Sequence, residues 1–278
     1  MASSDNPLEE EPLPVDTARR RYYESRFRSL MQFSYKLQKV LTGDAYASAR
    51  RHVRRILRGR ARLRFDAARI TKTVDAEKFR QVYQRHAVED PGDAWPKYLD
   101  LERWMEINLR RVQDLALDLG GRQRVLDIGC GTGYFLYICQ YLGHDVLGLD
   151  LDEEPGFTEM IELLGLNRKI WRVEAFEPLP DLGAKFDVIA AHMICFNGHK
   201  SERLWKIPEW EFFLDDLAAK HLEPGGQVCL ELNREYDDSL YTPELKKYFE
   251  SRGAEIHTQR VLFNPLRSAP AAVARVGR

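Results

Sequence analysis

The stretch from Val125 to Phe135, VLDIGCGTGYF, decides how this chain folds. It begins as a short apolar run, typical of a buried strand, and leads through three glycines into the apolar, helix-like sequence YFLYICQYLG. Because glycine adopts backbone conformations that a Cβ atom would forbid, Gly129, Gly131 and Gly133 predict a tight loop. In an open α/β sheet, ligands bind beyond the carboxyl ends of the strands, so this loop predicts a ligand site.

Short apolar runs alternate with helical stretches through the C-terminal half. The predicted strands are 124–129, 145–150, 169–175, 186–194, 227–233 and 254–263, and the predicted helices between them are 134–143, one through 160–165, 209–222 and 242–253. Several of these strands are nearly all apolar, which is typical of a parallel sheet that helices cover on both faces. We therefore expect one α/β domain over residues 119–268.

Residues 17–118 are expected to form an Arg-rich helical region ahead of this domain. The apolar spacing predicts helices over 18–42, 46–63, 75–88 and 97–118. The acidic, proline-containing residues 1–16 predict a disordered tail. Residues 269–278 are expected to form a second tail, and an edge strand over 271–276 is left open.

The glycine spacing separates this loop from two other nucleotide-binding loops. A dinucleotide fingerprint reads G-x-G-x-x-G, but Tyr134 stands here in place of its last glycine. No Lys-Ser/Thr pair follows the glycines, which excludes a Walker-type phosphate loop. The carboxylate of Asp127, at the end of the strand, would repel a pyrophosphate but suits an ammonium or sulfonium group.

The segment DIGCGTG resembles motif I of the class I S-adenosylmethionine-dependent methyltransferases. VLGLD is similar to the second strand of that family, which ends in a ribose-binding acid, here Asp150, and FDVIAAH and LEPGG follow in register. The resemblance extends from Arg122 to Phe263. It implies a methyltransferase with S-adenosylmethionine as its cofactor. The implied fold is a Rossmann-like, doubly wound, mostly parallel α/β sheet with an N-terminal α-helical extension.

The same resemblance implies a set of cofactor-binding residues. The residues of the first loop that would face the methionine part of the cofactor are Asp127, Gly129, Cys130, Gly131 and Gly133. Asp150 would hold the ribose, and Leu151 would pack against the adenine.

In this family, the loop after the third strand reads the adenine amine, which points here to Glu174, Ala175 or Phe176. The usual pattern there is Asp-Ala followed by polar residues, whereas this chain reads EAFEPLP. The register of this loop is therefore open by one residue.

Catalytic candidates lie just beyond the fourth predicted strand, in HMICFNGH. Methyl transfer is an in-line displacement that relies on positioning, and a hydroxyl acceptor also needs a base, which is most often histidine. His192 follows an apolar strand and is either a base that also contacts the cofactor or a structural histidine. His199, in a polar loop, is either a base or an exposed residue, and Asn197 either lies near the methyl group or shapes a turn.

Aromatic residues gather near this predicted mouth. The segment KYLDLERW, residues 97–104, is in position to cap the cofactor, as helices ahead of the first strand commonly do in such enzymes. Lys97 and Tyr98 are then candidate lid residues. In the plainer interpretation, Leu101 and Trp104 are the apolar face of a packed helix.

The net charge of −1 conceals a strong asymmetry. Residues 17–70 carry 16 Lys and Arg against three Asp and Glu, whereas the rest of the chain carries 26 against 40. Such a segment fits an anionic membrane surface or RNA, and it also fits docking onto the acidic remainder or onto a second copy in a homo-oligomer. It is equally typical of solvated helix faces with no external partner, and no RNA-binding motif with interleaved aromatics is visible.

Cysteine spacing and hydropathy bear on the setting of the protein. The four cysteines show no CxxC spacing, which makes a zinc site or a disulfide framework improbable and favours a reducing, cytoplasmic setting. No run reaches the ~18 apolar residues that a transmembrane helix needs, and no apolar leader opens the sequence.

The main hypothesis from the sequence is methyl transfer to an oxygen or nitrogen of a small-molecule or glycan-type acceptor. An RNA or protein methyltransferase guided by the basic helices is an alternative. A cofactor-binding partner protein without catalysis is another.

Overall fold

The computed structural model describes residues 66–86, 95–119, 121–194, 196, 204–234 and 239–268. The predicted acidic tail, the helices over 18–42 and 46–63 and the C-terminal residues 269–278 lie outside this part of the chain. The basic segment and its partners therefore stay predictions.

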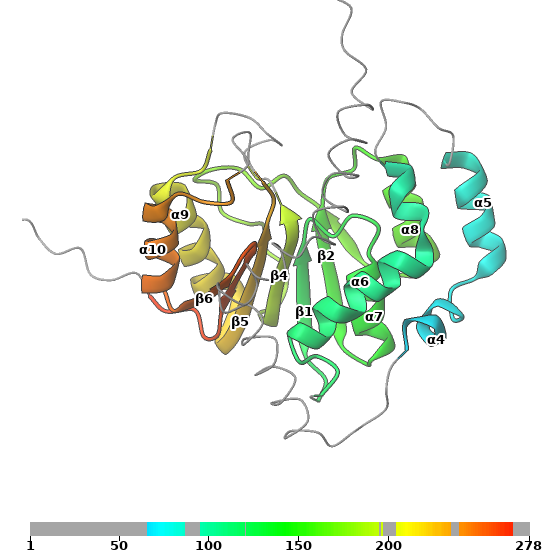
Figure 1. Cartoon of the computed structure of the whole chain (residues 1–278), viewed down its shortest axis with the longest axis horizontal. Helices are drawn as coiled ribbons and strands as arrows, with labels where there is room; N and C mark the ends of the chain where they lie inside the picture. The colour runs from blue at the N-terminus through cyan, green and yellow to red at the C-terminus, as the bar shows by residue number, and fades with distance from the viewer. Residues whose placement is uncertain are drawn as a thin grey trace, which may run out of the picture.

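The described elements follow one another as α/β units (Figure 1). The helices are α4 (Ala67–Thr71), α5 (Ala76–His86), the 3-10 helix η1 (Trp95–Leu99), α6 (Leu101–Asp114), α7 (Tyr134–Tyr141), α8 (Pro155–Leu163), α9 (Ile207–Asp216), the π-helical turn η2 (Leu217–His221) and α10 (Pro243–Ser251). The strands are β1 (Arg124–Ile128), β2 (Asp145–Asp150), β3 (Arg168–Ile170), β4 (Phe186–Ile194), β5 (Leu222–Leu232), β6 (Ala254–His257) and β7 (Arg260–Phe263).

The strands form one seven-stranded sheet in the order β3-β2-β1-β4-β5-β7-β6. The first five are parallel, while β7 runs antiparallel to β5 and to β6. The predicted mostly parallel sheet is therefore confirmed. The strand order reverses between β1 and β4, which is where open α/β sheets of this kind bind their ligands.

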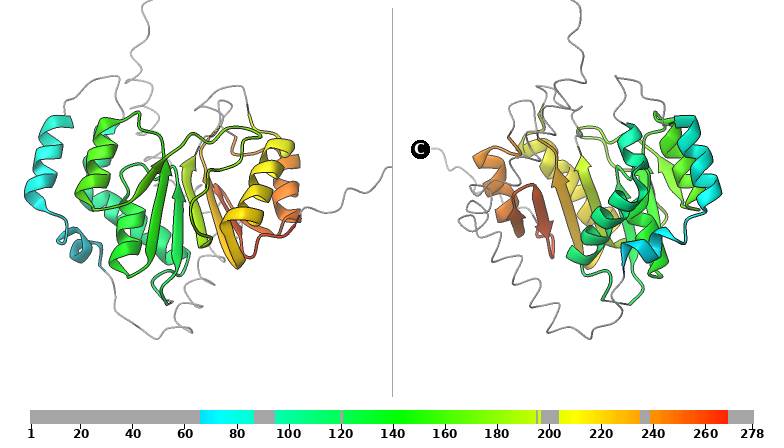
Figure 2. Two further views of the ribbon diagram at one scale, coloured as in Figure 1. Left: turned by 180° about the vertical axis from the view of Figure 1, so that it is seen from behind. Right: turned by 45° about the vertical axis from the view of Figure 1, so that its right-hand side comes forward.

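Helices cover both faces of the sheet (Figure 2). Val125 and Val188 belong to the apolar cluster that α4, α6, α7 and α8 share. Leu126 and Ile189, the next residues along each strand, belong to the cluster with α9 and α10. This alternation follows from the two-residue period of a strand.

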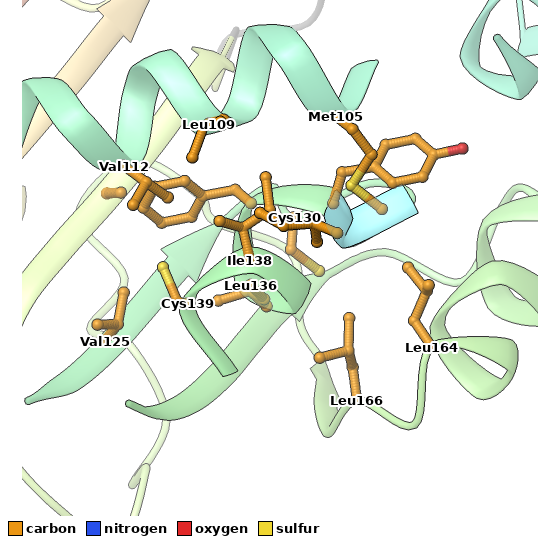
Figure 3. Packing of buried hydrophobic residues seen from close by; sticks show 14 of the residues in the cluster. Met105, Leu109, Val112, Val125, Cys130, Leu136, Ile138, Cys139, Leu164 and Leu166 are labelled. Atoms are coloured by element: carbon orange, nitrogen blue, oxygen red, sulfur yellow. The ribbon is translucent and has the colours of Figure 1, made fainter. Parts of the chain in front are cut away.

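Helix α6 packs across α7, ahead of the first strand in sequence. In Figure 3, Leu109 and Val112 of α6 lie over Ile138 and Cys139 of α7. Val112, Ile138 and Cys139 have no exposed surface. The helix is therefore an integral layer of the core rather than a detachable arm.

Several boundaries differ from the sequence prediction because of pairing with neighbours. Strand β3 stops at Ile170, not at 175, since it lies at the sheet edge with β2 as its only neighbour in the described sheet. The predicted single strand over 254–263 is wrong, because the chain reverses at Thr258 (φ 53°) to form the β6–β7 pair. Strand β5 begins at Leu222, ahead of the predicted 227, where it pairs with Phe186.

Two predicted helices also differ in extent. Helix α6 begins at Leu101 rather than 97, because the Asp100 side chain accepts a hydrogen bond from the amide of Arg103 and so caps it. It ends at Asp114, and Ala116 just beyond adopts a left-handed φ of 57°. The helix predicted over 209–222 is α-helical only to Asp216 and continues as the π-helical turn.

The described helices include none with the length and hydropathy that crossing a bilayer demands. Cys130, Cys139 and Cys229 are buried free thiols, and Cys195 lies outside the described residues. Burial raises the pKa of all three, to about 12 for Cys229, so they stay protonated.

Candidate functional site

A cavity of about 500 Å³ opens at the carboxyl ends of β1, β2 and β4. This size falls within the roughly 300–1,000 Å³ that is common for small-molecule sites. Its walls come from the glycine loop, the end of β2, the segment after β3, the end of β4 and the segment η1–α6. The ligand site predicted from the glycine loop is therefore a real cavity at the point where the strand order reverses.

The glycine loop forms the floor of the cavity and depends on backbone conformations that favour glycine. Gly129, Gly131 and Gly133 have φ angles of 73°, 52° and 80°, in the left-handed region. Gly129 and Gly131 line the cavity, whereas Gly133 lies at the start of α7. A Cβ atom on Gly133 would stand 2.5 Å from Leu166 and 2.7 Å from Ile161. Gly133 therefore serves close packing, and the other two leave the main chain open to the cavity.

Asp150 closes the loop against the end of β2. Its carboxylate accepts hydrogen bonds from the amide of Gly131 at 2.5 Å and from that of Leu151 at 2.7 Å. Burial raises the pKa of Asp150, and the nearby Asp127 carboxylate raises it further. The hydrogen bonds from the two amides lower this pKa but do not outweigh the burial. Both Asp150 and Leu151 line the cavity, so the residues predicted for the ribose and the adenine lie side by side.

His192 and Asp127 form a buried pair in the same cavity wall. His192 Nδ1 lies 3.3 Å from Asp127 Oδ1, and the two side chains are only 5% and 4% exposed. The ring of Phe135 meets the imidazole edge-on, with centroids 4.6 Å apart. Because a carboxylate only accepts hydrogen bonds, the neutral imidazole carries its proton on Nδ1 and its lone pair on Nε2.

The predicted cap over the cavity is formed by η1 and α6. Tyr98 and Trp104 both line the cavity, and their ring centroids lie 4.7 Å apart. The hydroxyl of Tyr134 donates to the carbonyl of Tyr98 at 2.7 Å, which joins the cap to α7. Lys97 places its ammonium 4.7 Å from the centre of the Tyr98 ring. Trp104 thus serves both as a packed residue and as part of the wall.

The segment after β3 contributes different residues from those predicted. Trp171, Arg172 and Val173 line the cavity. Glu174, Ala175 and Phe176, predicted to read the adenine, are exposed and are not among the lining residues.

The other predicted site residues divide into two groups. Cys130 lies in the cavity wall, but it is buried and its raised pKa keeps the thiol neutral. Asn197 and His199 lie outside the described residues, so their roles stay predictions. Of the three catalytic candidates, His192 is the one that the described part of the chain places in the cavity.

Sequence reasoning missed two groups that line the cavity from α6. Asn108 and Arg111 face it from one side of the helix. Their spacing of three residues matches one helical face, but lone polar residues on an amphipathic helix carry no signal of a site. Phe157 of α8, whose ring lies 3.9 Å from a Cβ built on Gly131, was also not predicted.

The donor set suits a cationic adenosine cofactor. Two carboxylates, the buried Asp127 and the partly buried Asp150, suit an ammonium group and a pair of ribose hydroxyls, and the glycine loop leaves room for a ligand to approach the main chain. The described residues contain no cluster of His, Cys, Asp and Glu able to hold a metal ion.

The sheet order and this site define a class I methyltransferase fold. A family model described as a methyltransferase domain matches residues 101–260, more than half of the chain. The chain therefore belongs to the class I S-adenosylmethionine-dependent methyltransferases, and its cofactor is S-adenosylmethionine.

The similarity to individual proteins is low and covers only part of each chain. A ubiquinone biosynthesis O-methyltransferase of Dechloromonas aromatica is 30% identical over 53% of this chain and 61% of its own. A tRNA U34 carboxymethyltransferase of Campylobacter hominis is 27% identical over 50% of each chain. A solved structure of CalS10, an amino pentose methyltransferase from Micromonospora echinaspora, is 25% identical, with a TM-score of 0.33 over 54% of this chain and 56% of its own. This chain thus spans about three fifths and one half of the two curated relatives.

Proposed function

We propose that this protein transfers the methyl group of S-adenosylmethionine to a hydroxyl, or else an amine, of a small-molecule or glycan-type acceptor. The observation that carries the proposal is the buried His192–Asp127 pair in the wall of the cofactor cavity, with Nδ1 and Oδ1 3.3 Å apart. A hydroxyl needs a base to become a good nucleophile, and histidine is the side chain that most often supplies one.

Each group in the pair then has a distinct part in the reaction. When bound, the cofactor supplies a methyl group that its positive sulfur makes electrophilic. Nε2 of His192 would take the proton of the acceptor hydroxyl as its oxygen bonds to the methyl carbon, and the bound cofactor would keep the electrons of the bond that breaks. Asp127 holds the imidazole in the tautomer that accepts on Nε2, and it stabilises the cation that forms.

The remaining assignments are also proposals. Asp150 holds the ribose hydroxyls, Leu151 packs against the adenine, and Gly129 and Gly131 face the methionine part. We assign the adenine pocket to Trp171 and Val173 as well, because these residues line the cavity where Glu174 does not. Tyr98 and Trp104 cover the cofactor from the cap side.

A labelled-methyl assay tests the acceptor class. The full chain, cofactor with a labelled methyl group and separated lysate fractions of small metabolites, glycans, RNA and protein would be incubated together. We expect label in the small-metabolite or glycan fraction. We also expect His192→Gln to lower that incorporation by a factor of about 10² to 10⁴, as for loss of a general base.

The control must separate loss of catalysis from loss of binding. His192→Gln should still bind the cofactor in calorimetry, since Asp150 and the glycine loop are intact. Label found in RNA or protein alone would overturn the acceptor class, and unchanged incorporation by His192→Gln would overturn the base.

An RNA acceptor is the second candidate. It is favoured by the similarity to a protein named as a tRNA U34 carboxymethyltransferase and by the 16 Lys and Arg of residues 17–70. A salt-dependent affinity for RNA that disappears when this basic segment is removed would support it.

A further inference from the structure

A row of ionisable side chains crosses the sheet from the cavity wall to β7. Asp127, His192, Glu231 and Arg260 stand on β1, β4, β5 and β7, which are consecutive strands of the sheet. The register pairs His192 with Glu231 and Glu231 with Arg260. The row therefore alternates carboxylate, imidazole, carboxylate and guanidinium from one strand to the next.

All four side chains face the layer of α6 and α7. Val125, Ala190 and Cys229, two residues before Asp127, His192 and Glu231, belong to the apolar cluster beneath these helices. Because side chains two positions apart in a strand share a face, the charged residues point to the same side.

Helix α6 supplies counter-charges to the far half of the row. Arg111 binds Glu231 with two nitrogens, at 2.7 Å and 3.0 Å, and both side chains are only 14% exposed. A third nitrogen of Arg111 donates to Asn108 Oδ1 at 3.0 Å. Asp114, one turn further along the helix, pairs with Arg260. The guanidinium of Arg111 is thus held in place against Glu231.

This arrangement bears directly on the charge around His192. Its titratable neighbours are Asp127 on β1 and Glu231 on β5; Arg111 on α6 and Arg260 on β7 act on it through Glu231, while Phe135 on α7 is neutral. Although burial opposes ionisation of Glu231, Arg111, His192 and Arg260 outweigh it and lower the pKa of this carboxyl. Glu231 is therefore a buried anion beside the imidazole, and Arg111 is its main counter-charge.

We propose that Arg111 is a positioning residue for catalysis: it neutralises Glu231 and so keeps His192 in the unprotonated form that can accept a proton from the acceptor. Without Arg111, Glu231 would keep only Arg260 as a counter-charge, so the imidazole would lie between two carboxylates with less compensation, and nearby anions favour the imidazolium. This inference rests on the proposed role of His192 as the base, and the experiment separates the two.

The test is an NMR titration of the full-length protein with labelled histidine. The chain has seven histidines, and His192→Gln identifies the signal of His192. In Arg111→Gln, the titration midpoint of His192 is expected to move up by about one pH unit or more relative to the unmodified protein. Arg111→Lys, which keeps the charge, should largely prevent the shift, and Arg111→Gln with Glu231→Gln should reverse it.

The matched control is Arg110→Gln. Arg110 is the adjacent residue on the same helix, but it is 73% exposed and pairs with Glu106. Its removal should leave the signal of His192 unchanged. An unchanged midpoint in Arg111→Gln would overturn the proposal, and so would a shift that persists when Glu231 is also neutral.

Activity is a separate readout. With the labelled-methyl assay at saturating cofactor, Arg111→Gln should lower kcat at neutral pH by up to about tenfold, and more alkaline pH should restore it. Full activity of His192→Gln would overturn the base role, and with it the catalytic part of the proposal, even where the titration shift is seen. A loss of kcat in Arg111→Gln that high pH does not restore would also count against it.

Discussion

Asp150 at the end of β2 accepts a hydrogen bond from the amide of Gly131 at 2.5 Å, which ties the proposed ribose-binding acid to the glycine loop. The same carboxylate accepts from the amide of Leu151 at 2.7 Å. One side chain therefore joins the glycine loop to the segment after β2 at the edge of the cavity.

We expect Asp150→Ala to weaken binding of S-adenosylmethionine about 10- to 100-fold. A hydrogen bond to a charged group contributes about 1.5–3 kcal/mol, and every 1.4 kcal/mol is roughly tenfold in affinity. Calorimetry with the full chain measures the effect. Asp145→Ala is the matched control, since Asp145 begins the same strand, is 49% exposed and pairs with Arg122. Equal affinities of Asp150→Ala and the unmodified protein would exclude Asp150 from the site.

We expect Gly133→Ala to destabilise the fold by about 2–4 kcal/mol. Its φ of 80° is unfavourable for alanine, and the new Cβ atom would overlap Leu166 and Ile161, at 2.5 Å and 2.7 Å. Urea denaturation measures the free energy of unfolding. Gly183→Ala, with φ 73° and nothing within 4 Å of its Cβ position, isolates the backbone cost and should lose only about 1–2 kcal/mol. Equal losses in the two variants would show that the contacts with Leu166 and Ile161 are unimportant.

Arg252 is expected to be a major stabilising residue near the C-terminal edge of the sheet. Its side chain has no exposed surface, and it donates to Asp215, to the Tyr248 hydroxyl and to the carbonyl of Arg267 at 2.7, 2.7 and 2.6 Å. Arg252→Ala should cost about 3–5 kcal/mol of unfolding free energy, measured by urea denaturation, because it removes all three bonds and the buried stem.

Lys246→Ala on the same helix is the comparison for Arg252. Its ion pair with Glu250 spans 3.5 Å between side chains that are about half exposed, 47% and 48%, so its loss should change stability by less than about 0.5 kcal/mol. A similarly small effect in Arg252→Ala would contradict the role given to its buried contacts.

His221 is expected to make stability depend on pH. Burial lowers the pKa of His221 and outweighs the opposing effect of the Asp216 carboxylate, 3.6 Å from Nε2. At pH values between the lowered pKa of the folded state and the ordinary pKa of about 6.5, the unfolded chain binds the proton and the folded chain does not. The contribution of His221 is therefore present above about pH 6.5 and is lost as the pH falls toward the folded-state value.

The comparison of His221→Gln with the unmodified protein measures this contribution. The difference in unfolding free energy between the two proteins should be constant near pH 8 and should move in favour of the variant as the pH falls to 5.5. A difference that stays the same over this range would show that His221 does not titrate differently in the folded state.

The elements that the sequence predicted well are those whose pattern is local. The apolar runs and glycines around Gly131 predicted β1, the loop and α7 without reference to any other part of the chain. The segment 254–263 was mistaken for one strand, because its division depends on β5, which pairs with β7 but not with β6. Glu174, Ala175 and Phe176 were expected in the loop after a third strand that was predicted to end at residue 175. Because β3 ends at Ile170, other residues after this strand line the cavity.

The cofactor and its loop could be inferred from one stretch of sequence because a strand, three glycines and a helix are neighbours in the chain. The surroundings of His192 could not be inferred in this way. Arg111 lies 81 positions before His192, and Glu231 lies 39 positions after it. They meet because the sheet places β5 beside β4 and Arg111 on α6 reaches Glu231, and such long-range pairing leaves no local trace in the sequence. The residues expected to bind the methyl donor can thus be recognised in one stretch of sequence. The charged groups around the proposed base come from distant segments that only packing brings together.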